Sequence, residues 1–576
     1  MELANYGSKL TSGDDGFNGT IHAYFNYGEK ANAGRVTNLE DGMGTSHRIL
    51  YAYATNPIVY KRTIANRYPV NTYALPIAVV RYVYANDGSA GHYYTEYGYE
   101  DLRLHIAGRG MLGFNKVTST NTSLGIKTST ETTKWDETRW LPTETKTVVE
   151  QGGCAATTLS TTTIVGQDKG NYFAYISKQE ATDMDGNRTI TRSTYDNGKG
   201  VPVEEVVEND ADNMYRRVTY GGYVKKQARW LPTTMTKTQK HKDDPSPFST
   251  TTSYKYDDNG NILSTTENYG TEMALTTTNT YNAQGNILTT VTTGKGVKPI
   301  TKHFEYDNDG RLVVKTFTTP ETSVNTFAYD EWGNLLTQTD ITNSAEPLTT
   351  THTYDGWGQE TQVVAADGTK TKVERRWTSP FSTEQYDIEV VSDGAPTVLT
   401  CYDQKGRELS KKSVGPKGVD INNKTTYNTN GLVSKIEKTT GKLTTKQVLT
   451  YDGRGRLVKE VLSSGKTTKY TYGNRTVTST IAETGQSVTK TFDAWGNVVK
   501  VEDPSGIVTY KYASVGKPAS VTAHGSTVCM TYDAAGNQTS LADPDAGTST
   551  YTYAADGTLL AQTDGKGTKT TYQFDE

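Results

Sequence analysis

The residues of this chain that could do chemistry are its carboxylates, histidines and cysteines. The sequence of 576 residues holds 64 acidic residues, eight histidines and three cysteines. Cys154, Cys401 and Cys529 are odd in number and too scattered for a CxxC metal site or a disulfide framework. The histidines form no HExxH metal motif and have no GxSxG companion, which favours scattered surface or strand positions for His22, His47, His92, His105, His241, His303, His352 and His524.

The carboxylates could supply a retaining or inverting glycosidase pair, because such a pair needs only two of them at a suitable separation. Calcium binding is a second candidate, at the oxygen-rich stretches 183–187 and 307–310. Neither stretch continues to a glutamate at the EF-hand distance, which favours a turn at both. Most aspartates of the second half also stand at turn positions. The sequence therefore predicts no catalytic residue, cofactor or metal, although a glycosidase pair stays open.

Composition narrows the class of protein. The net charge of −4 and the pI near 6.1 give no field that would recruit nucleic acid. No window approaches 18 consecutive apolar residues, and residues 1–16 lack the basic and apolar regions of a secretory signal. Hydrophobic residues with glycine make up about 43% of the chain, slightly below ordinary globular domains, so we expect a thin core. Tyrosine supplies 39 of the aromatic rings, and its hydroxyl suits a partly wet surface.

One phrase recurs through the second half at a nearly fixed spacing. Its anchor is the second aromatic residue of a Tyr-x-Tyr or equivalent pair, and successive anchors lie 20 to 25 residues apart. The single step of 48 residues, from Tyr354 to Tyr402, is two units with one anchor lost. Tyr195 and Tyr220 extend a degenerate array upstream. The regular anchors are Tyr256, Tyr281, Tyr306, Tyr329, Tyr354, Tyr402, Tyr427, Tyr451, Tyr472, Phe492, Tyr512, Tyr532, Tyr553 and Phe574.

Each unit predicts a strand, a tight turn and a returning strand. In residues 251–266, Tyr254 and Tyr256 alternate onto one face, and Asp257 and Gly260 occupy positions that a type I turn prefers. Threonine-rich filler suits strands, so we expect an all-β chain with almost no helix. The structural turn residues of this pattern are Asp257, Gly260, Asp307, Gly310, Asp330, Gly333, Asp452, Gly455, Asp493, Gly496, Asp533 and Gly536.

A single unit cannot fold by itself. It buries about two or three large apolar side chains, worth roughly 1.5–3 kcal/mol each. Ordering the unit costs about 1.5 kcal/mol for each residue. Neighbouring hairpins must therefore pair strand to strand in one continuous sheet, whose ends need capping.

The repeated phrase resembles the YD repeat of the Rhs proteins. HFEYDNDGRL (303–312), FAYDEWGNL (327–335) and VLTYDGRGRL (448–457) carry it clearly, and the resemblance runs from about residue 195 to the end. YTEYGYEDLRLHIAGRGMLGF (94–114), with VTNLEDGMGTSHRILYAY (36–53), resembles the segment before the repeats in Tc-toxin B components and related Rhs wrappers. GRGMLGF is its most specific phrase, with the motif residues Gly108, Arg109, Gly110, Gly113 and Phe114.

The resemblance implies a hollow β-shell in a bacterial polymorphic-toxin or Tc-like system. Its YD hairpins would spiral around a cavity that holds a C-terminal toxin domain or a partner polypeptide missing from this chain. In the related teneurins a similar barrel is displayed on a cell surface, so a surface adhesin or carbohydrate-binding protein with glycan partners is the alternative. Both readings imply a secreted or cell-surface protein without catalysis. A hydrolase on a β scaffold is the third hypothesis.

Many Rhs proteins also carry an aspartate-based self-cleavage site after their repeats. The nearest candidates here are DPSGIVTYKY (503–512) and DPDAGTSTYTY (543–553). Both stand on the repeat period and are typical of ordinary turns before a Tyr-x-Tyr strand. We therefore predict no cleavage site.

The phrase RWLPT occurs twice, at 139–143 and 229–233. It indicates an old duplication in which Trp140 and Trp230 cover a shell end and the prolines interrupt strand pairing. A stacking platform for sugar at the two tryptophans is the alternative.

The regularity of the repeat along the chain predicts three parts. They are an irregular β region over 1–130, a degenerate repeat region over 131–249 and a regular array over 250–576. The last residues, TTYQFDE (570–576), open a further unit without its glycine and returning strand. We therefore expect a truncated piece of a longer protein, with an open shell that associates through its C-terminal edge.

Overall fold

The computed structural model is nearly all β, which confirms the expected fold class. It describes residues 22–25, 34–40, 45–86, 92–166, 171–209, 212–319, 323–342, 345–378 and 384–574. Within these ranges the one helical segment is the 3-10 turn η2 (Pro416–Gly418), and no helix has the length and apolar character needed to cross a bilayer. The C-terminal Asp575 and the segment before His22 lie outside the described residues.

The N-terminal strands form the start of one 45-stranded sheet. Its order there is β1–β2–β3–β6–β7–β8–β9, all antiparallel, and β7 additionally pairs with β5 and, in parallel, with β4. These strands are β1 (His22–Phe25), β2 (Val36–Glu40), β3 (Ser46–Tyr53), β4 (Tyr60–Lys61), β5 (Val70–Thr72), β6 (Ala78–Asn86), β7 (His92–His105), β8 (Gly110–Asn121) and β9 (Ile126–Trp135).

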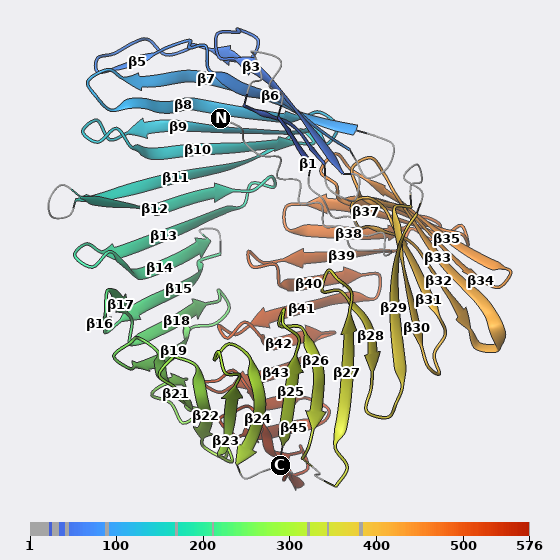
Figure 1. The fold of residues 1–576 in the computed structure, drawn as a ribbon. Coiled ribbons are helices and arrows are strands. Elements are labelled where there is room, and N and C mark those ends of the chain that lie inside the picture. The colour runs from blue at the N-terminus through green and yellow to red at the C-terminus, as the bar shows by residue number, and fades with distance from the viewer. Residues whose placement is uncertain are drawn as a thin grey trace.

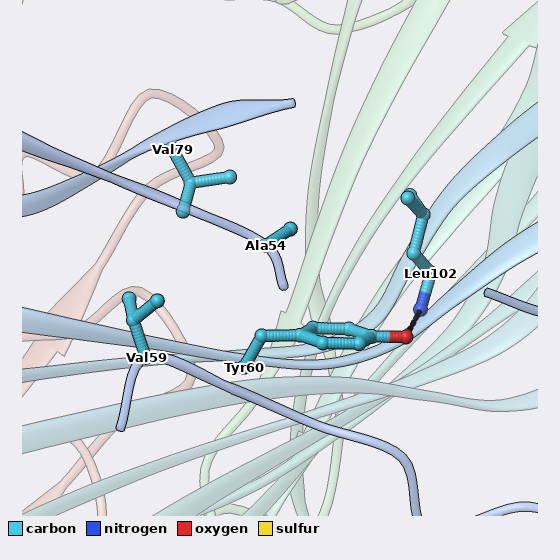
Figure 2. Packing of buried hydrophobic residues seen from close by; sticks show 5 residues of the cluster. All are labelled: Ala54, Val59, Tyr60, Val79 and Leu102. Atoms are coloured by element: carbon cyan, nitrogen blue, oxygen red, sulfur yellow. Dashed lines mark hydrogen bonds between the residues drawn. The ribbon is translucent and has the colours of Figure 1, made fainter. Parts of the chain in front are cut away.

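A cluster of buried hydrophobic side chains lies in this N-terminal part. Leu102 and Val59 are almost fully buried, and Tyr60 packs between them with Ala54 and Val79 (Figure 2). The Tyr60 hydroxyl accepts a hydrogen bond from the Leu102 backbone N–H and donates one to Tyr73 O. Burial, opposed by the Leu102 N–H, raises the pKa of Tyr60.

The sheet continues antiparallel through the middle of the chain. Each strand pairs with the next, except that β15 pairs with β18 and the short β16–β17 hairpin stands apart. The strands are β10 (Pro142–Gln151), β11 (Cys154–Gly166), β12 (Tyr172–Thr182), β13 (Arg188–Asp196), β14 (Val201–Asn209), β15 (Met214–Gly221), β16 (Val224–Lys226), β17 (Arg229–Leu231), β18 (Thr234–Lys240) and β19 (Phe248–Tyr256). The limits expected after residues 130 and 249 fall inside β9 and β19, and the division into three parts stays a prediction.

In its described residues the regular array adds 28 strands, each antiparallel to its predecessor. A bulge precedes many of the returning strands, as where Tyr256 pairs with Ile262. The first half holds β20 (Ile262–Glu267), β21 (Leu275–Tyr281), β22 (Ile287–Gly294), β23 (Ile300–Tyr306), β24 (Val313–Thr319), β25 (Val324–Tyr329), β26 (Leu335–Asp340), β27 (Leu348–Tyr354), β28 (Glu360–Val364), β29 (Lys370–Trp377), β30 (Tyr386–Ser392), β31 (Val398–Tyr402), β32 (Glu408–Gly415) and β33 (Val419–Tyr427). The second half holds β34 (Val433–Thr440), β35 (Leu443–Tyr451), β36 (Leu457–Leu462), β37 (Thr467–Gly473), β38 (Thr476–Ile481), β39 (Ser487–Phe492), β40 (Val498–Asp503), β41 (Gly506–Tyr512), β42 (Pro518–Ala523), β43 (Ser526–Tyr532), β44 (Gln538–Asp543), β45 (Gly547–Tyr553), β46 (Leu559–Thr563) and β47 (Lys569–Thr571).

The sheet curves until its late strands lie beside its early ones. Figure 1 shows β10–β19 along one side, β21–β28 around the bottom and β29–β35 on the other side, from where β37–β45 return. Lys295 accepts a backbone hydrogen bond from Ala555, which places the turn after β45 against the end of β22. The right-handed twist of neighbouring strands makes such coiling natural for a long sheet.

Candidate functional site

The YD turn is the repeated unit from which the site is built. At the turn between β25 and β26, one carboxylate oxygen of Asp330 accepts the backbone N–H groups of Trp332 and Asn334, at 2.9 and 2.8 Å. The other accepts the Asn334 side-chain amide at 2.8 Å. That amide, against the opposing effect of burial, holds the pKa of Asp330 below its ordinary value. Gly333 closes the turn by donating its N–H to Asp330 O.

The predicted turn residues all lie in such turns. Asp257, Asp493 and Asp533 repeat the Asp330 contacts with an asparagine four residues on. Arg456 replaces that asparagine beside Asp452, while Asp307 accepts the backbone N–H of Arg311. The turn glycines have φ from 69° to 88°, a region that favours glycine, and they are Gly260, Gly310, Gly333, Gly455, Gly496 and Gly536.

The anchor tyrosines tie each hairpin to the one before it. The Tyr451 hydroxyl donates a hydrogen bond of 2.7 Å to Val433 O, which lies at the start of the preceding returning strand. Buried hydroxyls of this kind are satisfied by protein instead of water. Sequence reasoning missed this, because it assigned the hydroxyls to a wet surface. The same bond is made by Tyr256, Tyr281, Tyr306, Tyr329, Tyr354, Tyr427, Tyr472, Tyr512, Tyr532 and Tyr553.

A second set of contacts joins parts of the sheet that are 252 to 288 residues apart in sequence. We call this line of contacts the seam. On one side are turns of the late array, and on the other are turns of the middle region and the turn after β22. The pairs across it are Asp185 with Arg454, Asp212 with Arg475, His241 with Asp493, Asp244 with Ser514 and Lys295 with Ala555.

The centre of the seam is a buried cluster around His241. Its side chain and that of Asp493 are both fully shielded from solvent, and the imidazole Nε2 lies 2.9 Å from the carboxylate. Nδ1 accepts the backbone N–H of Asp243 at 3.3 Å, so Nε2 carries the proton toward Asp493. Trp495 and Tyr512 pack on the ring. The expected surface or strand position is wrong for this histidine, because the covering turn comes from a distant part of the chain.

Serine, histidine and aspartate meet here without the geometry of a catalytic triad. The Ser514 hydroxyl accepts the backbone N–H of His241 at 3.1 Å and donates to Ser246 O at 2.7 Å. No hydrogen bond joins that hydroxyl to the imidazole in the described residues. A triad needs the imidazole to take the proton of the nucleophile. The arrangement therefore joins the segment after β18 to two turns of the late array. Its serine is not activated by the histidine.

Electrostatics favours the closed seam. Burial raises the pKa of Asp493, but the bonds from His241 and Asn497 outweigh it, so the pKa lies below its ordinary value. Asp185 receives the fork of Arg454 at 2.6 and 3.1 Å, which lowers the pKa of this carboxyl. Paired fork contacts of this kind are among the stronger hydrogen bonds in proteins. Both carboxylates are therefore held in the charged form that the seam needs.

The GRGMLGF motif that the sequence singled out lies in a turn and beside the hydrophobic core. At GRGMLGF, the glycines Gly108, Gly110 and Gly113 have positive φ, and the backbone N–H of Arg109 donates to His105 Nδ1. Phe114 packs on Tyr99 at a centroid distance of 4.7 Å, beside the core cluster. This phrase turns β7 into β8 and lies outside the seam. Of its family-motif residues, Phe114 packs beside the core cluster, and the three glycines shape the turn.

The two RWLPT copies adopt different local structures. Trp140 lies in the turn before β10 and packs on His105, whereas Trp230 belongs to β17 and lies under Lys199 and Lys225. Whether they cover a shell end stays a prediction. The oxygen-rich stretch at Asp183 is a turn whose carboxylate takes protein N–H donors from Asp185 and Asn187.

The comparisons with known proteins agree with this geometry. The family model described as the Teneurin YD-shell matches residues 222–368 and 382–514, and that of the insecticide toxin TcdB middle/N-terminal region matches residues 20–148. No curated protein matches the chain by sequence.

Solved structures of toxin complexes share the fold. The crystal structure of TcdB2-TccC3 has a TM-score of 0.68 at 10% identity, covering 94% of this chain and 40% of that chain. A Photorhabdus luminescens Tc holotoxin pore with a TccC3 mutation gives 0.69 at 9%, covering 94% and 42%, and TcdB2-TccC3-Cdc42 gives 0.66 at 10% with the same coverage. The chain thus spans about two-fifths of the structures it matches. Together with the YD turns and the tyrosine ladder, these matches show a YD-repeat array similar to the Teneurin YD-shell, preceded by a part similar to the TcdB toxin middle/N-terminal region.

Proposed function

We propose that this chain is a non-catalytic wall segment of a shell that encloses a toxin domain or partner polypeptide in a bacterial Rhs/Tc-like system. Such a wall must be continuous, and the parts of the sheet that meet at the seam must stay together. The observation that carries the proposal is the seam, where hydrogen bonds and ion pairs join turns that are more than 250 residues apart.

The tyrosine ladder supports the same role. Eleven anchor hydroxyls bond to the preceding hairpin, as Tyr281 does to Ile262 O at 2.7 Å. A net contribution of about 1 kcal/mol for each such bond, repeated along the array, stiffens the wall between hairpins. The toxin shells that share this fold contain a TccC3 partner, and a partner polypeptide is proposed for this chain by that likeness.

The polar groups of the site are already engaged, which is why we assign the chain no chemistry of its own. His241 and Asp493 hold each other in the buried cluster, and Ser514 holds the backbone of the facing turn. A catalytic group must be able to meet substrate, and these groups meet protein. Secretion or surface display of the assembled particle is part of the proposal.

The test is coexpression of the full chain with the polypeptide encoded next to it, followed by size-exclusion chromatography and limited proteolysis. We expect a stable complex in which the partner is cleaved at least tenfold more slowly than the free partner. A matched variant, Arg475→Ala, removes the seam contacts of Arg475 with Asn187, Asn209 and Asp212 and should speed that cleavage. Lys500→Ala removes only an exposed pair with Glu502 and should not. An unprotected partner, or selective binding on a glycan array by the chain alone, would contradict enclosure and favour adhesion.

A further inference from the structure

Two tryptophans stand exposed on successive YD turns. Trp332 is 84% exposed and Trp357 is 37% exposed, although tryptophan is usually well covered in a folded protein. The two turns lie against each other, because a Cβ placed on Gly358 would be 3.5 Å from Oδ1 of Asn334. We call residues 330–333 and 355–358 together the tryptophan edge.

The chain contains a third turn of the same kind that is already docked. In the sequence Asp-Ala-Trp-Gly at 493–496, Trp495 is half-buried and the guanidinium of Arg216 lies 4.5 Å from its ring centre. The carboxylate of Asp493 meanwhile accepts the N–H of His241. An Asp-x-Trp-Gly turn therefore docks by offering an indole face to a guanidinium and a carboxylate to an N–H donor.

The tryptophan edge offers the same two groups. Asp355 uses one oxygen for the backbone N–H groups of Trp357 and Gln359, both at 2.9 Å. Within the described residues, its second oxygen takes no hydrogen bond. Glu331 adds an exposed carboxylate beside Trp332.

Charge decides what kind of surface fits there. Two late turns at the seam present arginines, Arg454 and Arg475, to carboxylates of the facing turns. The docked turn of Asp493 instead presents a carboxylate, and the tryptophan edge and its neighbouring turns are acidic in the same way. Their acidic residues are Asp257, Asp258, Asp307, Asp309, Asp330, Glu331 and Asp355; the basic residue within these turns is Arg311, which pairs with Asp309, and Lys226 of β16 pairs with Asp258.

We propose that the tryptophan edge is a docking surface for an arginine-presenting face of a partner polypeptide, with guanidinium groups on Trp332 and Trp357 and beside Glu331. This surface is distinct from the seam. The proposal does not depend on what the shell encloses. Arginine is favoured over lysine because its planar guanidinium stacks on an indole while it donates to a carboxylate.

The test uses nona-arginine and nona-lysine peptides, which carry equal charge, as probes of the full chain by titration calorimetry. We expect the arginine peptide to bind at least fivefold more tightly than the lysine peptide. The double variant Trp332→Ala/Trp357→Ala should remove that difference, and Glu331→Gln should weaken both peptides. Both tryptophans are on the surface, so thermal melting should confirm that the variants fold.

The matched control is Tyr269→Ala, which removes an aromatic ring that is 55% exposed and lies in the turn after β20. It should leave the preference for arginine unchanged. Equal affinities for the two peptides, or an unchanged preference in the tryptophan double variant, would overturn the proposal. Binding of a glycan or a second copy of the chain through the two tryptophans, with no arginine preference, would overturn it as well.

Discussion

The imidazole of His241 lies 2.9 Å from the carboxylate of Asp493, although 252 residues separate them in the sequence. Neither side chain is exposed to solvent. A buried charge is tolerated only when it is paired and hydrogen-bonded. This contact therefore exists only while the turns on the two sides of the seam are together, so its presence shows that the seam is closed.

Removing one partner of this pair should destabilise the seam. We expect His241→Ala to lower the free energy of unfolding by about 3 kcal/mol or more, because it leaves the Asp493 carboxylate buried without its partner. His352→Ala is the control, since its pair with Glu360 is partly exposed and should cost less than about 1 kcal/mol.

Hydrogen exchange locates the effect. The backbone N–H groups of Ala494 and Ser514 donate to Asp212 and Asp244 across the seam. In His241→Ala these two amides should exchange faster than in the parent, while those of β25 keep their rates. Unchanged exchange rates at these two amides would show that the His241–Asp493 pair does not hold the seam together.

Turn glycines should resist substitution by β-branched residues. Gly496 has φ of 83° and open space around a placed Cβ, so Gly496→Val acts through backbone strain alone. We expect a loss of about 1–2 kcal/mol, and a similar or larger loss for Gly455→Val, whose Cβ would meet Leu432 at 3.5 Å. Gly496→Asn should cost less, because asparagine tolerates this region. A valine variant that melts with the parent would refute the turn geometry.

The tyrosine ladder should be measurable one bond at a time. Tyr451→Phe deletes the hydroxyl that bonds to Val433 O and should cost about 1 kcal/mol, because that carbonyl loses its donor. Tyr254→Phe is the matched control: its ring stacks on Tyr256, and its hydroxyl makes no hydrogen bond in the described residues. Equal melting temperatures for the two variants would count against the ladder.

Acid should weaken the seam. Asp185 and Asp493 have pKa values below their ordinary range, through the Arg454 fork and through the bonds that outweigh burial at Asp493. A lowered folded-state pKa contributes stability above the unfolded value, near 3.9, and that contribution is lost as pH falls through the folded value. Melting temperature should therefore drop steeply below about pH 4. Asp185→Asn should flatten that drop, and an unchanged slope would remove Asp185 from the explanation.

Screening the chain on glycoside, ester and peptide substrates should give no turnover. The carboxylates of the YD turns accept backbone N–H groups, and in the part of the chain that the structure describes no serine hydroxyl bonds to the buried imidazole of His241. Turnover that a single Asp or Glu substitution abolishes would contradict this and revive the glycosidase hypothesis.

The local part of this structure could be predicted because its contacts are local. Asp330 bonds to groups two and four residues ahead, and Gly333 follows three residues later, so spacing alone predicts the turn. The alternation of Tyr254 and Tyr256 likewise predicts strands. The all-β class and the stacking of hairpins follow from the same repeat.

Contacts between hairpins were only partly visible in the sequence. The repeat shows that a tyrosine stands at most anchors, but its acceptor is a backbone carbonyl 14 to 24 residues earlier, and every residue has such a carbonyl. The hydroxyl was therefore assigned to a wet surface. Pairing of the strands, together with the bulge before the returning strand, decides which carbonyl it reaches.

The amino-acid sequence by itself determined the repeat, its turns, the all-β class and the family resemblance, because each depends on residues within one hairpin. Only the tertiary structure decided the seam. The total curvature of the sheet decides which late turns meet which earlier turns when the sheet curves back on itself. That curvature accumulates from small twists between many neighbouring strands. Nothing in the sequence around His241 or Asp493 predicts that the two side chains pair. Their pairing, and the difference between the exposed Trp332 and the docked Trp495, depend on which turns meet when the sheet curves back on itself.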